Sequence, residues 1–189
     1  MGRPAVFLDR DGTMIHEVGY LARYEDLRWF SWTIDAIRLL KRAGFLVCVV
    51  TNQGGIGLGY YPEQFVIDTH NEMARVLTEV DARIDGWFYC PHHPRAVVDR
   101  FKGTCECRKP GRGMADQAAA ALDIDLGRSF AVGDKPSDVG LAKAFGGRGI
   151  LVRTGHGEDE LVNVRGVLPD AALVAHNLME ATSWILRAG

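Results

Sequence analysis

Short runs of apolar residues alternate along the chain with longer segments in which apolar residues recur every three or four positions. The runs lie at 5–9, 45–51, 84–90, 129–134 and 149–154, and most of them are continuous. Continuous apolar runs are typical of parallel strands that are buried on both faces. The periodic segments at 31–43, 62–80, 113–123, 136–146 and 177–187 predict helices. This alternation predicts an α/β fold with a doubly wound, Rossmann-like parallel sheet.

Length and composition indicate one domain. The chain has 189 residues, of which 47% are hydrophobic and 24% charged, and no repeat or linker divides it, so we expect a single domain over residues 1–189. A formal net charge of −2 gives no general attraction to nucleic acid or to an anionic membrane. No apolar run is long enough to cross a bilayer, and residues 1–12 do not resemble a signal peptide. We expect a cytoplasmic monomer with neither a nucleic-acid nor a membrane partner.

Polar side chains gather where the predicted strands end. Asp9 and Asp11 follow the first strand, Thr51, Asn52 and Gln53 end the second, and Asp134 ends the fourth. Ligands of open parallel sheets bind beyond the carboxyl ends of the strands. Asp9 can attack phosphorus there and Asp11 can transfer a proton, although Asp-x-Asp-Gly is also a common turn sequence. The hydroxyl, amide and glycine-rich segment 51–57 offers neutral donors to phosphate oxygens, or is a plain loop.

Charged residues at two further positions fit the same chemistry. Asp134 and Asp138 add carboxylates at another strand end, and carboxylates that converge from separate strands suit Mg²⁺. Alternatively, Ser137 or Asp138 caps the helix that begins after Pro136. Lys109 is a cation suited to the charge on a transferring phosphoryl group.

Three of the four cysteines lie in one polar loop, residues 90–107, which we call the zinc loop. Cys90 and His92 are followed, after residues 93–104, by Cys105 and Cys107. Two close pairs separated by a loop enclose a tetrahedral structural Zn²⁺, and free thiols are the alternative. We prefer His92 to His93 as the ligand because Cys-x-His then mirrors Cys-x-Cys.

The zinc loop is expected to depend on its metal for order. The loop is rich in charge and has few apolar residues, so zinc has to compensate the cost of ordering it. Cys107 is followed directly by Arg108 and Lys109. Zinc would therefore also fix two cations that point toward phosphate.

The segments DRDGT, TNQ, RKP and GDKPSD, in this order and spacing, resemble the four motifs of the haloacid dehalogenase superfamily of phosphatases. The resemblance implies that Asp9 is the nucleophile and Asp11 the general acid and base. It also implies that Thr51 and Lys109 stabilise the phosphoryl group, and that Mg²⁺ is held by Asp9, Asp134 and the backbone carbonyl of Asp11. No insertion is long enough for a separate cap domain, so an open, capless site is expected.

The zinc loop makes the chain similar to the heptose-bisphosphate and histidinol-phosphate phosphatase group of that superfamily. Similarity to the heptose branch implies removal of the C7 phosphate of D-glycero-D-manno-heptose 1,7-bisphosphate through an aspartyl-phosphate intermediate. It also implies a role in the synthesis of nucleotide-activated heptose for lipopolysaccharide. The resemblance does not indicate which anomer is the substrate. The resemblance implies substrate contacts for Glu17, Val18, Gly19, Tyr20, Thr51, Asn52, Gln53, Gly54, Arg108, Lys109 and Lys135. Gly54 and Arg112 stand where the group commonly has Ser and Pro, which puts the fine specificity in question.

Three other functions compete with this one. A histidinol-phosphate phosphatase is disfavoured by the long span 93–104, which offers a wall beside a capless site. A nucleic-acid end-processing phosphatase shares some of the motifs but needs a basic stripe. A zinc-organised binding or scaffold protein would need a broken catalytic set, and none of the four motifs is broken.

The remaining reactive residues are expected to be structural. Arg10 and Arg112 are interpreted as solvated surface charges. Cys48, within a predicted strand, is expected in the core. The histidines without ligand spacing are expected at the surface or in helix caps: His16, His70, His156 and His176.

Overall fold

Six parallel strands form one sheet in a computed structural model that describes residues 2–163 and 168–188. The strands are β1 (Ala5–Leu8), β2 (Leu46–Asn52), β3 (Gly86–Cys90), β4 (Phe130–Gly133), β5 (Arg148–Val152) and β6 (Ala171–Ala175). Their order in the sheet is β3-β2-β1-β4-β5-β6, and all the pairs are parallel. The chain thus starts at the centre, winds to one edge, and then winds to the other. The predicted doubly wound sheet is confirmed.

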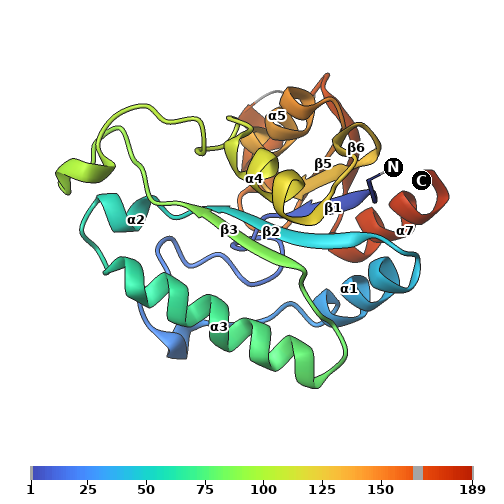
Figure 1. Cartoon of the computed structure of the whole chain (residues 1–189), viewed down its shortest axis with the longest axis horizontal. Coiled ribbons are helices and arrows are strands. Elements are labelled where there is room, and N and C mark those ends of the chain that lie inside the picture. Colours follow the sequence, from blue (N-terminus) through green and yellow to red (C-terminus); the bar gives the residue numbers. More distant parts are fainter. Residues whose placement is uncertain (1, 164–167, 189) are drawn as a thin grey trace.

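Helices cover both faces of the sheet, which explains why its strands are continuously apolar. One face carries α1 (Thr33–Arg42), α3 (Glu63–Glu79) and α7 (Leu178–Ala188), and the other carries α4 (Gly113–Leu122) and α5 (Pro136–Phe145) (Figure 1). Alternate residues of β1 point to opposite layers. Val6 and Leu8 pack with the first group of helices, whereas Ala5 and Phe7 pack with the second. Cys48 is fully buried in the second layer, as expected.

Three elements were not predicted from the sequence. The short helix α2 (Gly54–Gly57) has the sequence GGIG, which has very low helix propensity. The strand β6 is alanine-rich, lies at the sheet edge and is partly exposed. The helix α6 (Gly157–Asn163) packs only Leu161 against Val139 and Leu151. Their sequences alone carry little sign of helix or strand, so the packing around them determines their structure.

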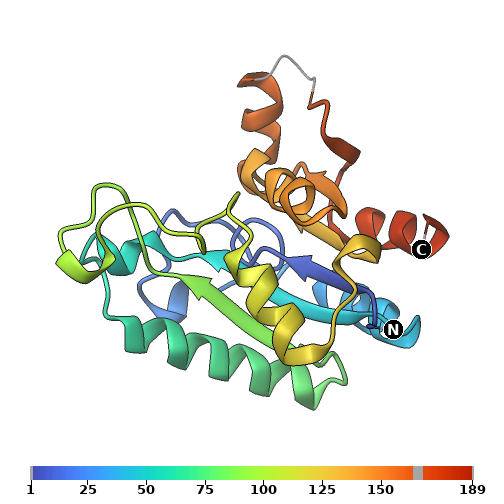
Figure 2. The ribbon, with the colours of Figure 1, turned by 45° about the horizontal axis from the view of Figure 1, so that its top comes forward.

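Two long connections surround the carboxyl ends of the central strands. Residues 9–32 join β1 to α1 and contain the 3₁₀ turn η1 (Tyr24–Asp26), and residues 91–112 join β3 to α4 and contain η2 (Asp99–Phe101). Neither connection forms a separate folded cap, in agreement with the capless fold. In Figure 2 the arrowheads of β1 and β3 point toward the zinc loop, and both termini lie at the opposite end. No helix within the described ranges has the length and hydrophobicity that crossing a membrane requires.

The zinc loop has more apolar support than its sequence indicated. Ala96 and Phe101 are buried in a small cluster with Ile56, Tyr61 and Val66. Backbone N–H groups of 97 and 98 also donate to the carbonyl of Gly57, at 2.8 and 3.1 Å. The expectation that the loop has little apolar packing was therefore wrong, because its partners come from a distant segment of the chain.

Candidate active site

A cavity of about 480 Å³ opens at the carboxyl ends of the central strands. It is lined by Asp9, Arg10, Asp11, Glu17, Gly19, Tyr20, Leu21, Thr51, Asn52, Gln53, Gly54, Tyr61, His93, Arg108, Lys109, Lys135, Ser137 and His156. Nearly all the predicted catalytic and substrate-contact residues therefore meet in one place. Val18 is the exception: it does not line the cavity, and it is 45% exposed beside it. Its neighbours in the 17–20 segment face the cavity while Val18 points elsewhere.

The ammonium group of Lys109 lies under the cavity between two carboxylates. Its Nζ is 2.8 Å from Oδ1 of Asp9 and 2.5 Å from Oδ1 of Asp138, and it also donates to the carbonyl of Val50 at 2.9 Å. Burial opposes the charge, but Asp138 and Asp9 outweigh it and raise the pKa of Lys109 above its usual range. Lys109 is therefore a fixed cation beside the predicted nucleophile.

Asp138 caps a helix, as considered from the sequence, and also pairs with Lys109. Its Oδ2 accepts the backbone N–H of Lys135 at 3.1 Å, which caps α5, while its Oδ1 pairs with Lys109. Sequence reasoning considered Asp138 as a carboxylate for Mg²⁺ or as a helix cap, but it did not predict the pairing with Lys109. The GDKPSD motif contained it, but the contact with Lys109 depends on a loop from the other half of the sheet.

Asp134 is fully buried, and only one of its two carboxylate oxygens has a hydrogen-bond partner among the described residues. Its Oδ2 accepts the backbone N–H of His156 at 2.8 Å, whereas Oδ1 is buried and has no hydrogen-bond partner among the described residues. Burial, with Asp9 nearby, raises the pKa of Asp134 to about 8. Ligand oxygens of Asp9, Asp134 and Asp138 come within 4.8 Å of one another. A hard divalent cation such as Mg²⁺ fits this set of oxygen donors.

Two glycines make room for Asp134. Gly12 and Gly155 both have positive φ, 77° and 58°, and a Cβ built on either would lie 2.2 or 2.3 Å from Oδ2 of Asp134. Any side chain at these positions would displace the carboxylate. The turn is closed by Thr154, which donates to the carbonyl of Gly12 at 2.5 Å.

The carboxylate of Asp11 is held by donors from two sides. Arg10 donates from Nε to Oδ2 at 3.1 Å and from Nη2 to Oδ1 at 3.0 Å, and Gln53 Nε2 donates to Oδ2 at 2.9 Å. Burial would favour the neutral acid, but Arg10 and then Gln53 hold the pKa of Asp11 below its usual range. The same Gln53 amide donates to Oγ1 of Thr51 at 2.8 Å, and its Oε1 accepts from Tyr61 at 3.0 Å.

Asn52 fixes the position of Lys109 through its backbone. The Asn52 Oδ1 accepts the N–H of Lys109 at 3.0 Å, and its Nδ2 donates to the Lys109 carbonyl at 3.3 Å. Asn52 was predicted to contact the substrate. Its side chain lines the cavity, but both of its polar atoms already bind the backbone of Lys109.

A cluster of charged and aromatic side chains forms the rim of the cavity. Oε2 of Glu17 is 3.6 Å from Nζ of Lys135 and 3.4 Å from Nε2 of His156, and its Oε1 accepts the N–H of Gly19 at 2.6 Å. Tyr20 is half exposed. His156 was expected at the surface or in a cap; its backbone holds Asp134 and its ring faces the cavity. No spacing signal in the sequence marks it.

Arg108 reaches the cavity over Gly54. Its Nη1 donates to the carbonyl of His92 at 2.9 Å. A Cβ on Gly54 would lie 3.0 Å from Cδ2 of His93 and 3.3 Å from Nη1 of Arg108, so glycine at 54 lets both side chains approach α2 closely. Arg112, the other departure from the common pattern, is outside the cavity. It is half exposed and pairs with Asp116, as expected of a surface charge.

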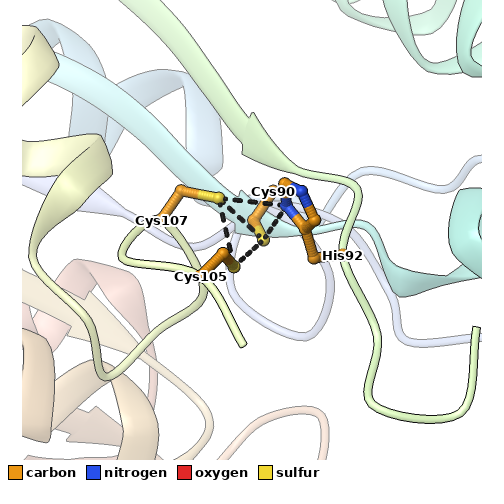
Figure 3. Close-up of side chains that lie close together, drawn as sticks. All are labelled: Cys90, His92, Cys105 and Cys107. Carbon is orange, nitrogen blue, oxygen red and sulfur yellow. Dashed lines mark hydrogen bonds between the residues drawn. The ribbon is translucent and has the colours of Figure 1, made fainter. Parts of the chain in front are cut away.

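The four predicted zinc ligands lie together, and their donor atoms point toward one another (Figure 3). The Cys107 Sγ lies 3.1 Å from Cys90 Sγ, 3.4 Å from Cys105 Sγ and 3.3 Å from His92 Nδ1. All four cysteines of the chain are free thiols. Three sulfurs and one imidazole nitrogen suit a closed tetrahedral Zn²⁺ site. His93, the alternative ligand, points instead into the cavity.

Two residues expected at the surface are buried beside Asp11. Arg10 is only 1% exposed and His70 5%, and Nη1 of Arg10 lies 3.3 Å from Nε2 of His70. Both expectations were therefore wrong. A long-range contact between the connection after β1 and α3 satisfies these polar groups, and the local sequence pattern does not record such a contact.

Comparison with known proteins gives a consistent result. A family model described as HAD-hydrolase-like matches residues 106–181. The D-glycero-beta-D-manno-heptose-1,7-bisphosphate 7-phosphatase of Escherichia coli (strain K12) is 43% identical over 153 residues, which are 80% of each chain. The protein of the same name from Rhodopseudomonas palustris is 42% identical over 166 residues, or 88% of this chain and 91% of that protein.

Solved structures of similar proteins share the whole architecture. The D,D-heptose 1,7-bisphosphate phosphatase from B. bronchiseptica, complexed with magnesium and phosphate, superposes with a TM-score of 0.85 at 29% identity and covers 98% of this chain and 99% of that one. The corresponding enzyme from Burkholderia thailandensis superposes with a TM-score of 0.71 at 28% identity, over 97% of this chain and 99% of that one.

Proposed function

The chain belongs to the heptose-1,7-bisphosphate 7-phosphatase family of haloacid dehalogenase-like hydrolases, and on this premise we propose that it removes the C7 phosphate of D-glycero-β-D-manno-heptose 1,7-bisphosphate and leaves the C1 phosphate in place. The observation that carries the proposal is the meeting of Asp9, Asp11, Lys109 and Asp134 at one end of the sheet. The β-anomer, which the sequence left open, follows the names of the curated relatives.

The proposed reaction has two steps. In the first, a carboxylate oxygen of Asp9 bonds to phosphorus while the bond between phosphorus and the C7 oxygen breaks, and Asp11 gives that oxygen its proton. In the second, Asp11 takes a proton from a water molecule, whose oxygen bonds to phosphorus and releases Asp9 and inorganic phosphate. A phosphate dianion beside Asp11 opposes Arg10 and favours the protonated acid that the first step needs.

The cations of the site have separate tasks in this proposal. Lys109, fixed by Asp9 and Asp138, offsets charge on the transferring phosphoryl group. Asp9, Asp134 and the backbone carbonyl of Asp11 would hold Mg²⁺, and the unpartnered Oδ1 of Asp134 supports this assignment. When bound, Mg²⁺ neutralises part of the repulsion between the nucleophile and the phosphate.

The rim supplies the proposed selectivity. Arg108 and Lys135 line the cavity beyond the catalytic groups and can pair with the second phosphate of a bisphosphate. Histidinol phosphate presents a cationic amine instead, which the same two side chains would repel. The span 93–104 was expected to form a wall here, but only His93 of these described residues lines the cavity. Zn²⁺ at the four ligands would keep Arg108 in place through the carbonyl of His92.

A comparison of three substrates tests the proposal. The parent protein with Mg²⁺ receives the β-heptose 1,7-bisphosphate, fructose 1,6-bisphosphate or histidinol phosphate, and phosphate release is measured. We expect kcat/KM for the heptose to exceed that for histidinol phosphate by about 100-fold, or about 2.7 kcal/mol. Phosphorus NMR of the product should show the anomeric phosphate retained. A preference for histidinol phosphate, or loss of the C1 phosphate, would refute the assignment.

A further inference from the structure

Asp11 is oriented by a guanidinium group that is itself inaccessible to solvent. Arg10 is only 1% exposed. Two of its nitrogens donate to the carboxylate of Asp11, Nε to Oδ2 at 3.1 Å and Nη2 to Oδ1 at 3.0 Å. A bidentate pair of this kind fixes the plane of a carboxylate as well as its position. Because a buried charge is costly unless its hydrogen bonds are satisfied, the remaining nitrogen of Arg10 also needs a partner.

That partner is a histidine from the opposite side of the cavity floor. Nη1 of Arg10 lies 3.3 Å from Nε2 of His70 on α3. A guanidinium can only donate, so Nε2 must accept and the imidazole is neutral, with its proton on Nδ1. Burial, and then Arg10, lower the pKa of His70 to about 3, so the ring stays an acceptor at neutral pH.

The His70 ring is held in place by aromatic neighbours. Its centroid lies 4.9 Å from that of Trp87 and 5.9 Å from that of Tyr89, both on β3. The chain of contacts runs from β3 through His70 and Arg10 to Asp11. Each member has little freedom to move.

The two oxygens of Asp11 are not equivalent in this arrangement. Oδ2 accepts from Arg10 Nε and from Gln53, whereas Oδ1 accepts one hydrogen bond, from Arg10 Nη2. A carboxylate oxygen has two acceptor sites, so Oδ1 keeps one for a proton. Rotation of Arg10 would change which oxygen is free.

We propose that His70 is a positioning residue for phosphoryl transfer: by accepting a hydrogen bond from Arg10, it fixes the orientation in which Asp11 presents Oδ1 to the leaving oxygen. The inference rests on the proposed role of Asp11 as general acid and base. His70 contacts neither the substrate nor the phosphoryl group, and it acts only through Arg10.

Leaving-group dependence separates this role from a merely structural one. The parent and His70→Phe, which keeps a ring against Trp87 but has no acceptor, are assayed with the heptose bisphosphate and with 4-nitrophenyl phosphate. A sugar alkoxide needs a proton to leave, whereas 4-nitrophenolate does not. Because kcat/KM covers only the steps up to the aspartyl phosphate, we expect it to fall about tenfold or more for the sugar and less than about threefold for the aryl ester.

Two further variants complete the test. His70→Gln restores a neutral acceptor and should return kcat/KM for the sugar to within about threefold of the parent. His70→Leu replaces His70→Phe if far-UV circular dichroism shows that the phenylalanine variant does not fold. Equal losses on both substrates, or no rescue by His70→Gln, would overturn the inference about His70. A parent that releases phosphate from neither substrate would instead contradict the proposed function.

Discussion

The ammonium group of Lys109 and the carboxylates around it determine the electrostatics of the cavity floor. Asp9 faces Lys109 on one side and the unpartnered oxygen of Asp134 on the other. Because Lys109 already pairs with Asp138 as well, it cannot neutralise the whole set. The remaining negative charge favours a divalent cation, which would place the carboxylate of Asp9 between two positive charges.

Replacement of Asp9 by asparagine should abolish turnover without unfolding the protein. The amide has nearly the same shape, so the sheet should be unaffected, but it is a very poor nucleophile toward phosphorus. Phosphate release from the heptose bisphosphate should fall by at least about a thousandfold, with an unchanged circular dichroism spectrum. Release within tenfold of the parent would remove Asp9 from the role of nucleophile.

The buried His70 should make stability depend on pH. Its pKa is lowered to about 3 in the folded state, whereas an unfolded chain has a histidine pKa near ~6.5. Between these values the unfolded state binds the extra proton, so the free energy of unfolding falls as the pH falls from about 6.5 toward 3. Urea unfolding at pH 7 and pH 5 should show that the parent loses about 2 kcal/mol more than His70→Gln. Equal losses would show that His70 is accessible to protons in the folded state.

At the scale of elements, the connection from β3 to α4 carries three functions in one segment. Residues 91–112 supply three of the four proposed zinc ligands, residues that line the cavity, and Lys109, which is proposed to be catalytic. The segment is anchored to α2 through Gly57 and to the end of β2 through Asn52. Disturbance at its middle should therefore be transmitted to Lys109.

Substitution of Cys107 by serine should separate metal content from folding. We expect zinc per chain to fall, hydrogen exchange in 91–107 to rise, and kcat to fall about tenfold or more as Arg108 and Lys109 lose their anchor. The control is Cys48→Ala, which removes a buried thiol that is not among the proposed zinc ligands and should keep both zinc and activity. A purified parent with much less than one zinc per chain would contradict the structural role.

Prediction from the sequence worked where local pattern determines structure. Strands β1 to β5 follow from continuous apolar runs, the main helices follow from apolar periodicity, and the carboxylates of the site follow from their place at strand ends. The short elements α2 and β6 were missed because glycine disfavours helices and alanine disfavours strands. Arg10 and His70 were misplaced because their burial depends on a contact between residues sixty positions apart.

The whole molecule separates its stabilising core from its catalytic end. Two apolar layers flank the sheet, and neither includes Asp9, Asp11 or Asp134. Hydrophobic burial thus supports the fold, while the charged groups that oppose one another gather at the carboxyl ends of the strands. The fold should therefore tolerate removal of the proposed Mg²⁺.

Brief treatment with EDTA should stop turnover and leave the fold intact. Removal of Mg²⁺ leaves the nucleophile and the phosphate to repel each other, so the rate should fall about a hundredfold or more. The circular dichroism spectrum should not change, and excess Mg²⁺ should restore activity within the mixing time. Activity that persists through chelation would exclude a catalytic divalent metal.

Gly12 and Gly155 show that the proposed metal site depends on positions without a side chain. A single Cβ at either position would enter the space of the Asp134 carboxylate, and both backbones have positive φ. Transplanting the acidic residues alone into another parallel sheet would therefore not reproduce the centre. A transplanted site would need the two glycines and their turns as well. The two loops, and not the acidic residues alone, would therefore have to be transferred.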